Sequence, residues 1–288
     1  MAQWNIGDVK ITRIIESESA WPGTWLLPDA TADRVKQERS GKSWLSDFTD
    51  EAGKFRLSIH ALVLESQGKR IIVDTCIGND KIRKSNPDWS NLKLPFMDDL
   101  KAAGFTADQV DHVVCTHLHV DHVGWNTKLV DGKWVPTFGN AQYVIGGTEW
   151  DFFSKMEDAF MKDPVDDSVR PVIDRGQAKL VDSNHKITDE VWLEPTPGHT
   201  PGHHSVRISS KGQNAVITGD LMHHPVQCAY PEWDDAFDSD GAMAKKTRRA
   251  FCEKYADSGV IVFGTHFASP SCGQIKKAGD GFSFHAQK

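Results

Sequence analysis

The stretch Thr116-His117-Leu118-His119-Val120-Asp121-His122-Val123-Gly124 decides how the rest of the chain is interpreted. It directly follows the apolar run His112-Val113-Val114-Cys115, which is typical of a buried strand. Three histidines and one aspartate therefore fall within six residues, where a strand ends and a loop begins. A cluster of this composition and spacing indicates a metal site.

The spacing also indicates how these ligands divide. Residues two apart in an extended segment point the same way, so His117 and His119 can reach one ion together. Asp121 and His122 lie past the turn and point elsewhere, which suits a second ion nearby. Imidazole and carboxylate ligands together suit Zn²⁺ and similar divalent metals.

This pattern, His-x-His-x-Asp-His at a strand end, resembles the hallmark of the metallo-β-lactamase superfamily. Three further ligands of that family have counterparts here in the expected order. His199 follows a strand in a Gly-His turn, Asp220 ends a later strand, and His266 ends a strand near the C-terminus. The resemblance extends from about Val9 to His266.

The resemblance implies a dinuclear centre with an assigned ligand set. One ion would be bound by His117, His119 and His199, the other by Asp121, His122 and His266, with Asp220 bridging the two. Two ions about 3.5–4 Å apart can share a hydroxide, lower its pKa from about 15.7 to near 7, and direct it at a carbonyl or phosphoryl centre. Zn²⁺ is the expected metal, although the same ligands accept Mn²⁺, Co²⁺ or Fe²⁺. A structural zinc is not expected, since such sites close at four ligands, usually with cysteine.

Two further residues gain a role from the resemblance. Asp74 ends the strand 70–73, where the family places an Asp that orients a metal-binding His; the alternative is an Asp that caps a turn. His223 lies three residues after Asp220. Acyl-homoserine lactonases carry a Tyr there, and the subgroup resembling methyl parathion hydrolase carries a His. We expect His223 to act in catalysis with Asp121 and Asp220, by contacting the oxyanion or the leaving group; the alternative is a bystander His in a loop.

Composition narrows the functional class. The chain has 288 residues and a net charge of −7, and no Lys/Arg cluster offers a track for phosphates, so a nucleic-acid partner is not expected. Five scattered cysteines without a Cys-x-x-Cys pair indicate free thiols in a reducing compartment. The N-terminus does not resemble a signal peptide, and no apolar run approaches about 18 residues, so we expect a cytoplasmic protein without membrane contact.

Hydrophobic periodicity predicts a mixed α/β protein. Strands are expected at 9–15, 57–64, 70–74, 112–115, 142–145, 191–194, 205–208, 215–218 and, as the last strand, 260–263; helices are expected at 95–103, 147–156 and 241–255. This order resembles the superfamily's four-layer αβ/βα sandwich, with two mixed sheets face to face, helices outside and metals at one edge. We expect residues 1–288 to form a single domain of this type.

One segment, 17–54, fits neither a strand nor a helix pattern and is predicted to be a long loop. It contains Trp21, Trp25 and Trp44. We expect the N-terminal extension 17–56 to form a pocket wall or the contact of a homodimer; the alternative is an extension packed on its own core.

These features predict a dinuclear metal-dependent hydrolase that cleaves lactones or aryl esters, with phosphotriesterase side activity. The substrate would be a small molecule, held in an apolar pocket built from the abundant Trp and Phe. The alternatives are a dedicated organophosphate hydrolase, a β-lactamase, and a metal-binding or sensing protein without turnover. A β-lactamase is disfavoured by Asp220, because zinc β-lactamases generally lack the bridging Asp. An iron-dependent oxidoreductase also stays open at this point.

Overall fold

The computed structural model describes residues 2–84, 86–182 and 184–287. Within these residues, the strands form a seven-stranded sheet, a six-stranded sheet and a separate hairpin. The first sheet has the order β1 (Gln3–Ile6), β2 (Val9–Pro22), β3 (Lys54–Ser66), β4 (Lys69–Val73), β5 (His112–Val114), β8 (Gln142–Gly146) and β9 (Ala178–Val181). The second has the order β10 (Val191–Pro195), β11 (His204–Ser210), β12 (Gln213–Ile217), β13 (Ile261–Phe263), β14 (Cys272–Ala278) and β15 (Gly281–Ala286). The hairpin pairs β6 (Thr127–Val130) with β7 (Lys133–Pro136).

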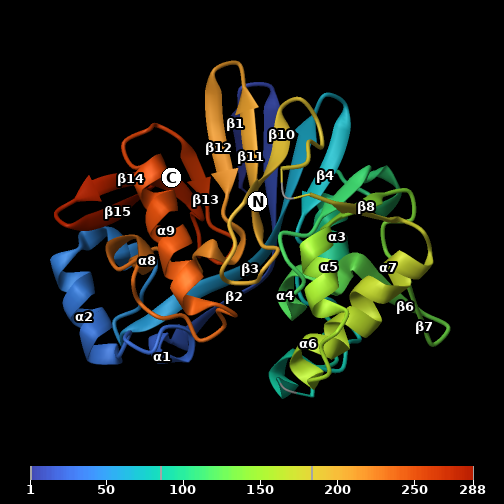
Figure 1. Cartoon of the computed structure of the whole chain (residues 1–288), viewed down its shortest axis with the longest axis horizontal. Helices are drawn as coiled ribbons and strands as arrows, with labels where there is room; N and C mark the ends of the chain where they lie inside the picture. The colour runs from blue at the N-terminus through green and yellow to red at the C-terminus, as the bar shows by residue number, and fades with distance from the viewer. Residues whose placement is uncertain (1, 85, 183, 288) are drawn as a thin grey trace.

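Helices cover the outer faces of both sheets (Figure 1). The α-helices are α1 (Gly23–Leu26), α2 (Ala32–Gly41), α3 (Phe96–Ala102), α4 (Val120–Val123), α5 (Gly147–Phe153), α6 (Ala159–Pro164), α7 (Arg170–Asp174), α8 (Val226–Ala229) and α9 (Gly241–Tyr255). The short 3-10 helices are η1 (Ser43–Asp47), η2 (Pro87–Trp89), η3 (Ala107–Gln109), η4 (Gly124–Asn126) and η6 (Gly219–Leu221), and η5 (Val165–Val169) is a π-helical turn. In Figure 1, α3, α5, α6 and α7 lie on one side of the strands and α9 lies on the other.

Three apolar clusters account for these layers. The central cluster joins the sheets to each other, with Ile11 and Val114 from the first and Val206 and Ile217 from the second. A second cluster packs α3 and α5 on the outer face of the seven-stranded sheet, and a third packs α9 on the six-stranded sheet. Burial of these apolar faces is the main favourable term in the packing. The predicted αβ/βα sandwich is confirmed.

The direction of the strands determines where the predicted ligands lie. β4, β5 and β8 run parallel in one sheet, and β12 and β13 run parallel in the other. The carboxyl ends of parallel strands meet at one edge, so the loops after β4 and β5 lie opposite those after β12 and β13. Asp74, the stretch from His117 to His122, Asp220 and His266 all lie in these loops.

The prediction that 17–54 is a loop was wrong. β2 continues to Pro22 and pairs with β3 as far as Lys54, and α2 follows, capped by the Thr31 hydroxyl. A register shift between Ile15 and Ser17 breaks the alternation on which the strand prediction relied. The helix was missed because α2 is mostly polar and buries only one apolar side chain.

The prediction that the strand at 260–263 is the last was also wrong. β14 and β15 follow it and form an antiparallel hairpin at the end of the six-stranded sheet. Their sequences hold several polar residues, and Gly279 supplies the positive φ of the turn that joins them. Among the residues that the structure describes, no helix combines the length and apolarity needed to cross a membrane.

Candidate metal centre

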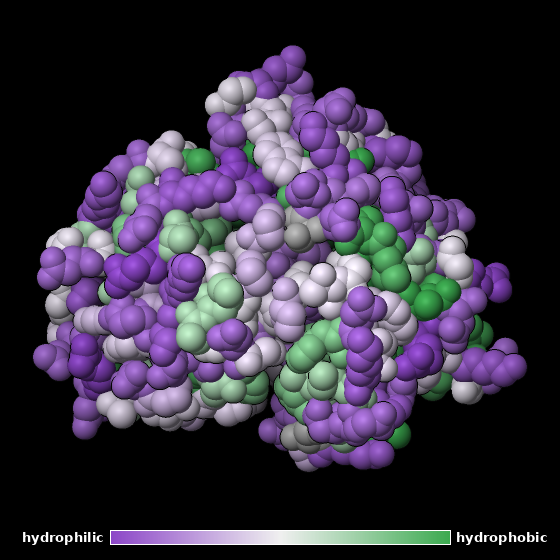
Figure 2. Space-filling view, viewed as in Figure 1, coloured by the Kyte–Doolittle hydropathy of each residue, from purple (hydrophilic) through white to green (hydrophobic). Residues whose placement is uncertain are grey.

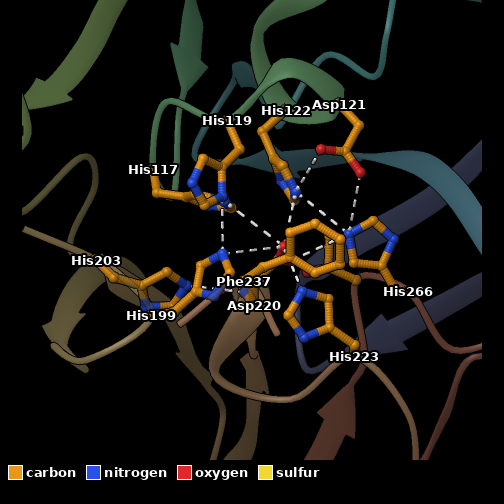
Figure 3. Close-up of polar contacts among 12 residues, drawn as sticks. His117, His119, Asp121, His122, His199, His203, Asp220, His223, Phe237 and His266 are labelled. Atoms are coloured by element: carbon orange, nitrogen blue, oxygen red, sulfur yellow. Dashed lines mark hydrogen bonds and ion pairs between the residues drawn. The ribbon is translucent and has the colours of Figure 1, made fainter. Parts of the chain in front are cut away.

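All seven residues predicted as ligands lie together at the edge where the two sheets meet (Figure 3). They are His117, His119, Asp121, His122, His199, Asp220 and His266. Donor atoms of the first group, His117, His119, His199 and Asp220, lie within 4.8 Å of one another, as do those of a second group, Asp121, His122 and His266. A third such group, Asp220, His223 and His266, includes His223, which is not among the predicted ligands.

The first group is tightly packed. His119 Nδ1 lies 3.0 Å from His117 Nε2 and 2.9 Å from His199 Nε2. Asp220 Oδ2 closes the group at 3.6 Å from His117 Nε2 and 3.5 Å from His199 Nε2. Four donors bound to a tetrahedral ion at about 2.0–2.1 Å lie roughly 3.3 Å apart, so these spacings fit one zinc-sized cation.

The second group shares Asp220 with the first. His122 Nε2 lies 3.1 Å from Asp220 Oδ2, and His266 Nε2 lies 3.2 Å from Asp220 Oδ1. The two oxygens of Asp121 lie 3.7 Å from His122 Nε2 and 3.5 Å from His266 Nε2. Figure 3 shows Asp220 between the two groups, where one carboxylate can serve both.

The ligand atoms of the first group cannot all be satisfied by hydrogen bonds to one another, whereas a bound cation would satisfy them. A neutral imidazole has one N–H and one lone pair, so His119 Nδ1 cannot donate to His117 and His199 at once. Burial lowers the pKa of His117 and His119 well below the ordinary value, which keeps both rings neutral. Converging lone pairs without protons between them are unfavourable unless a positive ion lies among them. All donors are N or O, a set that accepts Zn²⁺, Mn²⁺, Co²⁺ or Fe²⁺.

In the second group, neighbouring carboxylates and histidines favour the charged forms of Asp220 and His122. Burial opposes the ionisation of Asp220, but His122, His266, His223 and His117 together hold its pKa well below the usual range. Burial likewise opposes a charge on His122, yet Asp220, Asp74 and Asp121 raise its pKa well above the ordinary value. A divalent cation bound by these carboxylates would displace that proton.

Asp74 lies directly behind His122. Its Oδ2 is 2.9 Å from His122 Nδ1, so His122 can donate that proton to Asp74 and present Nε2 to the cluster. Thr116 holds Asp74 in place, because its backbone N–H donates to Oδ1 at 2.8 Å and its hydroxyl to Oδ2 at 2.9 Å. Asp74 therefore contacts both a backbone N–H and the ring of a ligand candidate, and its orienting role stays a prediction.

His223 lies beside the cluster, between two carboxylates. Its Nε2 is 3.0 Å from Asp220 Oδ2, and its Nδ1 is 2.8 Å from Asp235 Oδ2. Burial opposes its charge, but Asp235 and Asp220 raise its pKa well above the ordinary value. The ring also stacks on that of His266 at 5.4 Å between centroids.

Sequence reasoning missed several polar residues around the cluster. Asp235 and Asp238 lie behind His223 and His199 in the loop before α9, and no role at the metal site was predicted for either. His203, to which no role was assigned, accepts a hydrogen bond at Nε2 from the backbone N–H of Asp220. Glu149 accepts from the backbone N–H groups of Leu118 and Gly202 and so joins two ligand loops. The only sequence signal for Glu149 was a Glu near the start of a predicted helix, which is not specific.

A cavity of about 350 Å³ opens above the cluster. His119, Asp121, His199, Asp220, His223 and His266 line its floor. Aromatic and aliphatic side chains form most of its walls, namely Trp21, Trp25, Leu26, Leu57, Ile59, Ile77, Trp89, Leu92, Leu94, Phe160 and Phe237. The polar residues Ser17, Ser19, Asn86 and Asp88 complete them. The Phe237 ring contacts both Trp25 of α1 and Phe160 of α6, and Figure 2 shows the surface indented between the regions of α1 and α6. None of the described residues that line the cavity is Lys or Arg.

The fold and the site agree with the family match. A model of the metallo-β-lactamase superfamily matches residues 55–266, and the chain belongs to this superfamily. Its curated relatives include N-acyl homoserine lactonases.

Individual relatives are distant. An N-acyl homoserine lactonase of Bacillus thuringiensis is 26% identical over 118 residues, which are 41% of this chain and 40% of the lactonase. The match thus spans less than half the length of that enzyme. An uncharacterized protein of Aquifex aeolicus is 24% identical over 224 residues, 77% of this chain and 90% of that protein.

Solved structures resemble the chain over its whole length. AidC, a dizinc quorum-quenching lactonase solved with the product N-hexanoyl-L-homoserine, has a TM-score of 0.78 at 20% identity and covers 100% of this chain and 97% of its own. The hydrolase AbOPH has a TM-score of 0.80 at 23% identity, over 99% and 98% of the two chains. At these identities the likeness establishes the fold alone.

Proposed function

We propose that this protein is a dinuclear metal-dependent hydrolase that cleaves lactones or aryl esters, with phosphotriesterase side activity. One observation carries the proposal: seven residues with N and O donors converge beneath a cavity, five of them line its floor, and most of its wall is aromatic or aliphatic. The lactonase relatives and the fold shared with AidC support the lactone class. The fold shared with AbOPH supports hydrolase chemistry in a site of this shape.

The cavity supports an uncharged substrate with an apolar arm. Among the described residues that line it there is no Lys or Arg to bind a carboxylate or a phosphate monoester. Trp21, Trp25 and Phe237 form a continuous wall, with ring centroids 5.3 Å and 4.9 Å apart along the series. Such a wall accepts an acyl chain or an aromatic leaving group equally well. Lactones, aryl esters and phosphotriesters share this character.

The roles of the chain's own residues follow from their positions. Two divalent cations, with Zn²⁺ the proposed metal, would be held by the seven ligand candidates and would supply an activated water and polarise the substrate oxygen. Asp121 lines the cavity, and its carboxylate is placed to hold the proton that the attack releases. His223, kept in position by Asp235, can donate from Nε2 to the developing oxyanion or to the leaving oxygen. The wall residues exclude bulk water around these groups. The homodimer stays a prediction.

Kinetics with metal removal and replacement test this function. A panel of acyl-homoserine lactones, aryl esters and paraoxon is assayed before chelation, after chelation, and after Zn²⁺ is restored. We expect turnover of lactones or aryl esters that is lost with the metal and regained with it. The variant His119→Ala should lose that turnover, whereas His285→Ala, an exposed histidine on β15, should keep it. Tight metal binding without turnover of any substrate in the panel would instead favour a binding or sensing protein.

A further inference from the structure

One face of α9 packs against the turn that carries His199. Ala244, Thr247 and Arg248 are spaced three and four residues apart, so they share a face of the helix. The Thr247 hydroxyl donates to the carbonyl of Pro197 at 2.7 Å. Gly198 lies so close to the helix that a Cβ there would be 2.4 Å from the Cα of Ala244. The backbone before His199 is therefore held against α9.

Arg248 is the third contact on this face, and it is completely buried. Its Nε donates to the carbonyl of Leu221 at 3.0 Å, and its Nη1 donates to those of Pro231 and Trp233 at 3.1 and 3.0 Å. Its Nη2 donates to Asp238 Oδ2 at 3.1 Å. Asp238 is the one carboxylate that Arg248 contacts among the described residues, and it is itself only 1% exposed. A buried guanidinium with this many fixed partners holds that carboxylate rigidly.

The other oxygen of Asp238 faces a metal-ligand candidate. Oδ1 lies 3.1 Å from His199 Nδ1, while His199 Nε2 lies 2.9 Å from His119 Nδ1 within the cluster. Backbone hydrogen bonds also join the loop of Asp238 to the turn of His199. Ser239 N donates to the carbonyl of His199, and Asp240 N donates to the carbonyl of Gly198. An anionic acceptor at Nδ1 keeps the neutral ring's proton there and leaves the Nε2 lone pair directed at the cluster.

We propose that Arg248 and Asp238 form a positioning pair, in which Arg248 fixes Asp238 and Asp238 fixes the tautomer and direction of His199 for a metal ion. The inference rests on the proposed metal centre, although not on any particular substrate. Neither residue reaches the cavity, so both act through His199.

The variant Asp238→Asn isolates this role. Its amide oxygen can still accept from Arg248, but its NH₂ group then faces His199 Nδ1 and selects the tautomer with the proton on Nε2. Asp234→Asn is the matched control, because Asp234 also joins this loop to α9, through a 2.7 Å ion pair with Lys245, and has no contact with a histidine among the described residues. Zn²⁺ affinity of the folded, metal-free proteins is measured by competition with a chelator, and thermal unfolding of the metal-free proteins is measured alongside.

We expect Asp238→Asn to weaken the binding of one Zn²⁺ by about 10–100-fold and Asp234→Asn to leave it unchanged. Equal affinity in Asp238→Asn and wild type, or an equal loss in the two variants, would overturn the positioning pair. A loss of unfolding temperature without a loss of affinity would show a merely structural role and would also overturn it. A wild-type protein that binds no Zn²⁺ would remove the metal centre itself, which is a distinct result.

A double-mutant cycle tests whether Arg248 affects Zn²⁺ binding through Asp238. If Arg248 acts through Asp238, Arg248→Lys should weaken Zn²⁺ binding in the wild type but add little in the presence of Asp238→Asn. Fully additive losses would contradict the relay. Should Arg248→Lys fail to fold, the comparison of the two aspartate variants still decides the proposal.

Discussion

At the scale of single residues, the histidines of the cluster differ in what lies behind them. His122 is backed by Asp74 and His199 by Asp238, whereas His266 Nδ1 lies 3.1 Å from the carbonyl of Ser58. A carboxylate behind an imidazole raises its basicity as well as fixing its direction, and a carbonyl does mainly the latter. The carboxylate-backed rings are therefore the most sensitive points of the site.

Asp74→Asn tests this for His122. We expect metal affinity about 10–100-fold below wild type, because the amide cannot replace the anionic acceptor. Asn is chosen because Asp74 has φ +56°, a left-handed conformation that Asn tolerates. Asp80→Asn, at another left-handed position with φ +64° but away from the cluster, is the control. Chelator competition measures the affinity, and an unchanged value in Asp74→Asn would remove the orienting role.

His223→Ala tests a catalytic role at the cavity floor. We expect kcat to fall by about 100-fold or more with metal content unchanged, because the variant loses a donor to the developing charge while all seven proposed ligands remain. Steady-state kinetics and elemental analysis give the two values. Full kcat on every substrate of the panel would show that His223 is a bystander.

At the scale of elements, a buried lysine joins the loop after β4 to two other segments. Lys81 Nζ donates to the hydroxyl of Thr127 on β6 at 2.6 Å, lies 3.5 Å from the carboxylate of Asp167 on η5, and sits 3.6 Å from the ring centroid of Trp134 on β7. Burial lowers the pKa of Lys81 from 10.5 to about 7; Asp167 opposes this shift and Arg83 adds to it. Its charge therefore differs between the folded and unfolded chain over part of the pH range.

Lys81→Met should change how stability depends on pH. Between pH 7 and 10.5 the unfolded chain binds a proton at Lys81 that the folded chain has released, so this residue makes the free energy of unfolding rise with pH in that window. Below pH 7, Lys81 carries its proton in both the folded and the unfolded chain, so it does not make the free energy of unfolding depend on pH. Denaturant unfolding at several pH values should show the wild-type curve rising more steeply than the variant's, by at most about 1.4 kcal/mol per pH unit. Parallel curves would show that Lys81 keeps its ordinary pKa.

At the scale of the whole molecule, the proposed metal centre connects the two sheets. The stretch from His117 to His122 follows β5 of the seven-stranded sheet, and His199, Asp220 and His266 follow strands of the six-stranded sheet. Bound metal is therefore expected to hold the two halves of the sandwich together.

Metal removal should lower the unfolding temperature of the whole chain. A ligand that binds only the folded state stabilises it by about 4 kcal/mol when its free concentration is 1,000 times its dissociation constant. Calorimetry should show a lower Tm after chelation and recovery when Zn²⁺ is restored, and this response should persist in His285→Ala. A Tm that does not respond to Zn²⁺ would contradict the expected cross-link between the sheets.

The sequence by itself determined the features that depend on local spacing. The ligands within 117–122 are close in the chain, and the resemblance to the superfamily located His199, Asp220, His266 and Asp74 at the ends of further predicted strands. The N-terminal strand beyond Ile15 and the final hairpin escaped detection, because a register shift and several polar residues remove their periodicity.

Only the tertiary structure decided which groups stand behind the ligands and what covers them. Asp235, Asp238 and Arg248 meet the cluster through a loop and a helix face that are distant in sequence from most of the ligands. The aromatic wall likewise joins α1, α6 and the loop before α9. The physical reason is that a ligand motif is set by the geometry of one short segment, whereas these contacts depend on how separate layers pack.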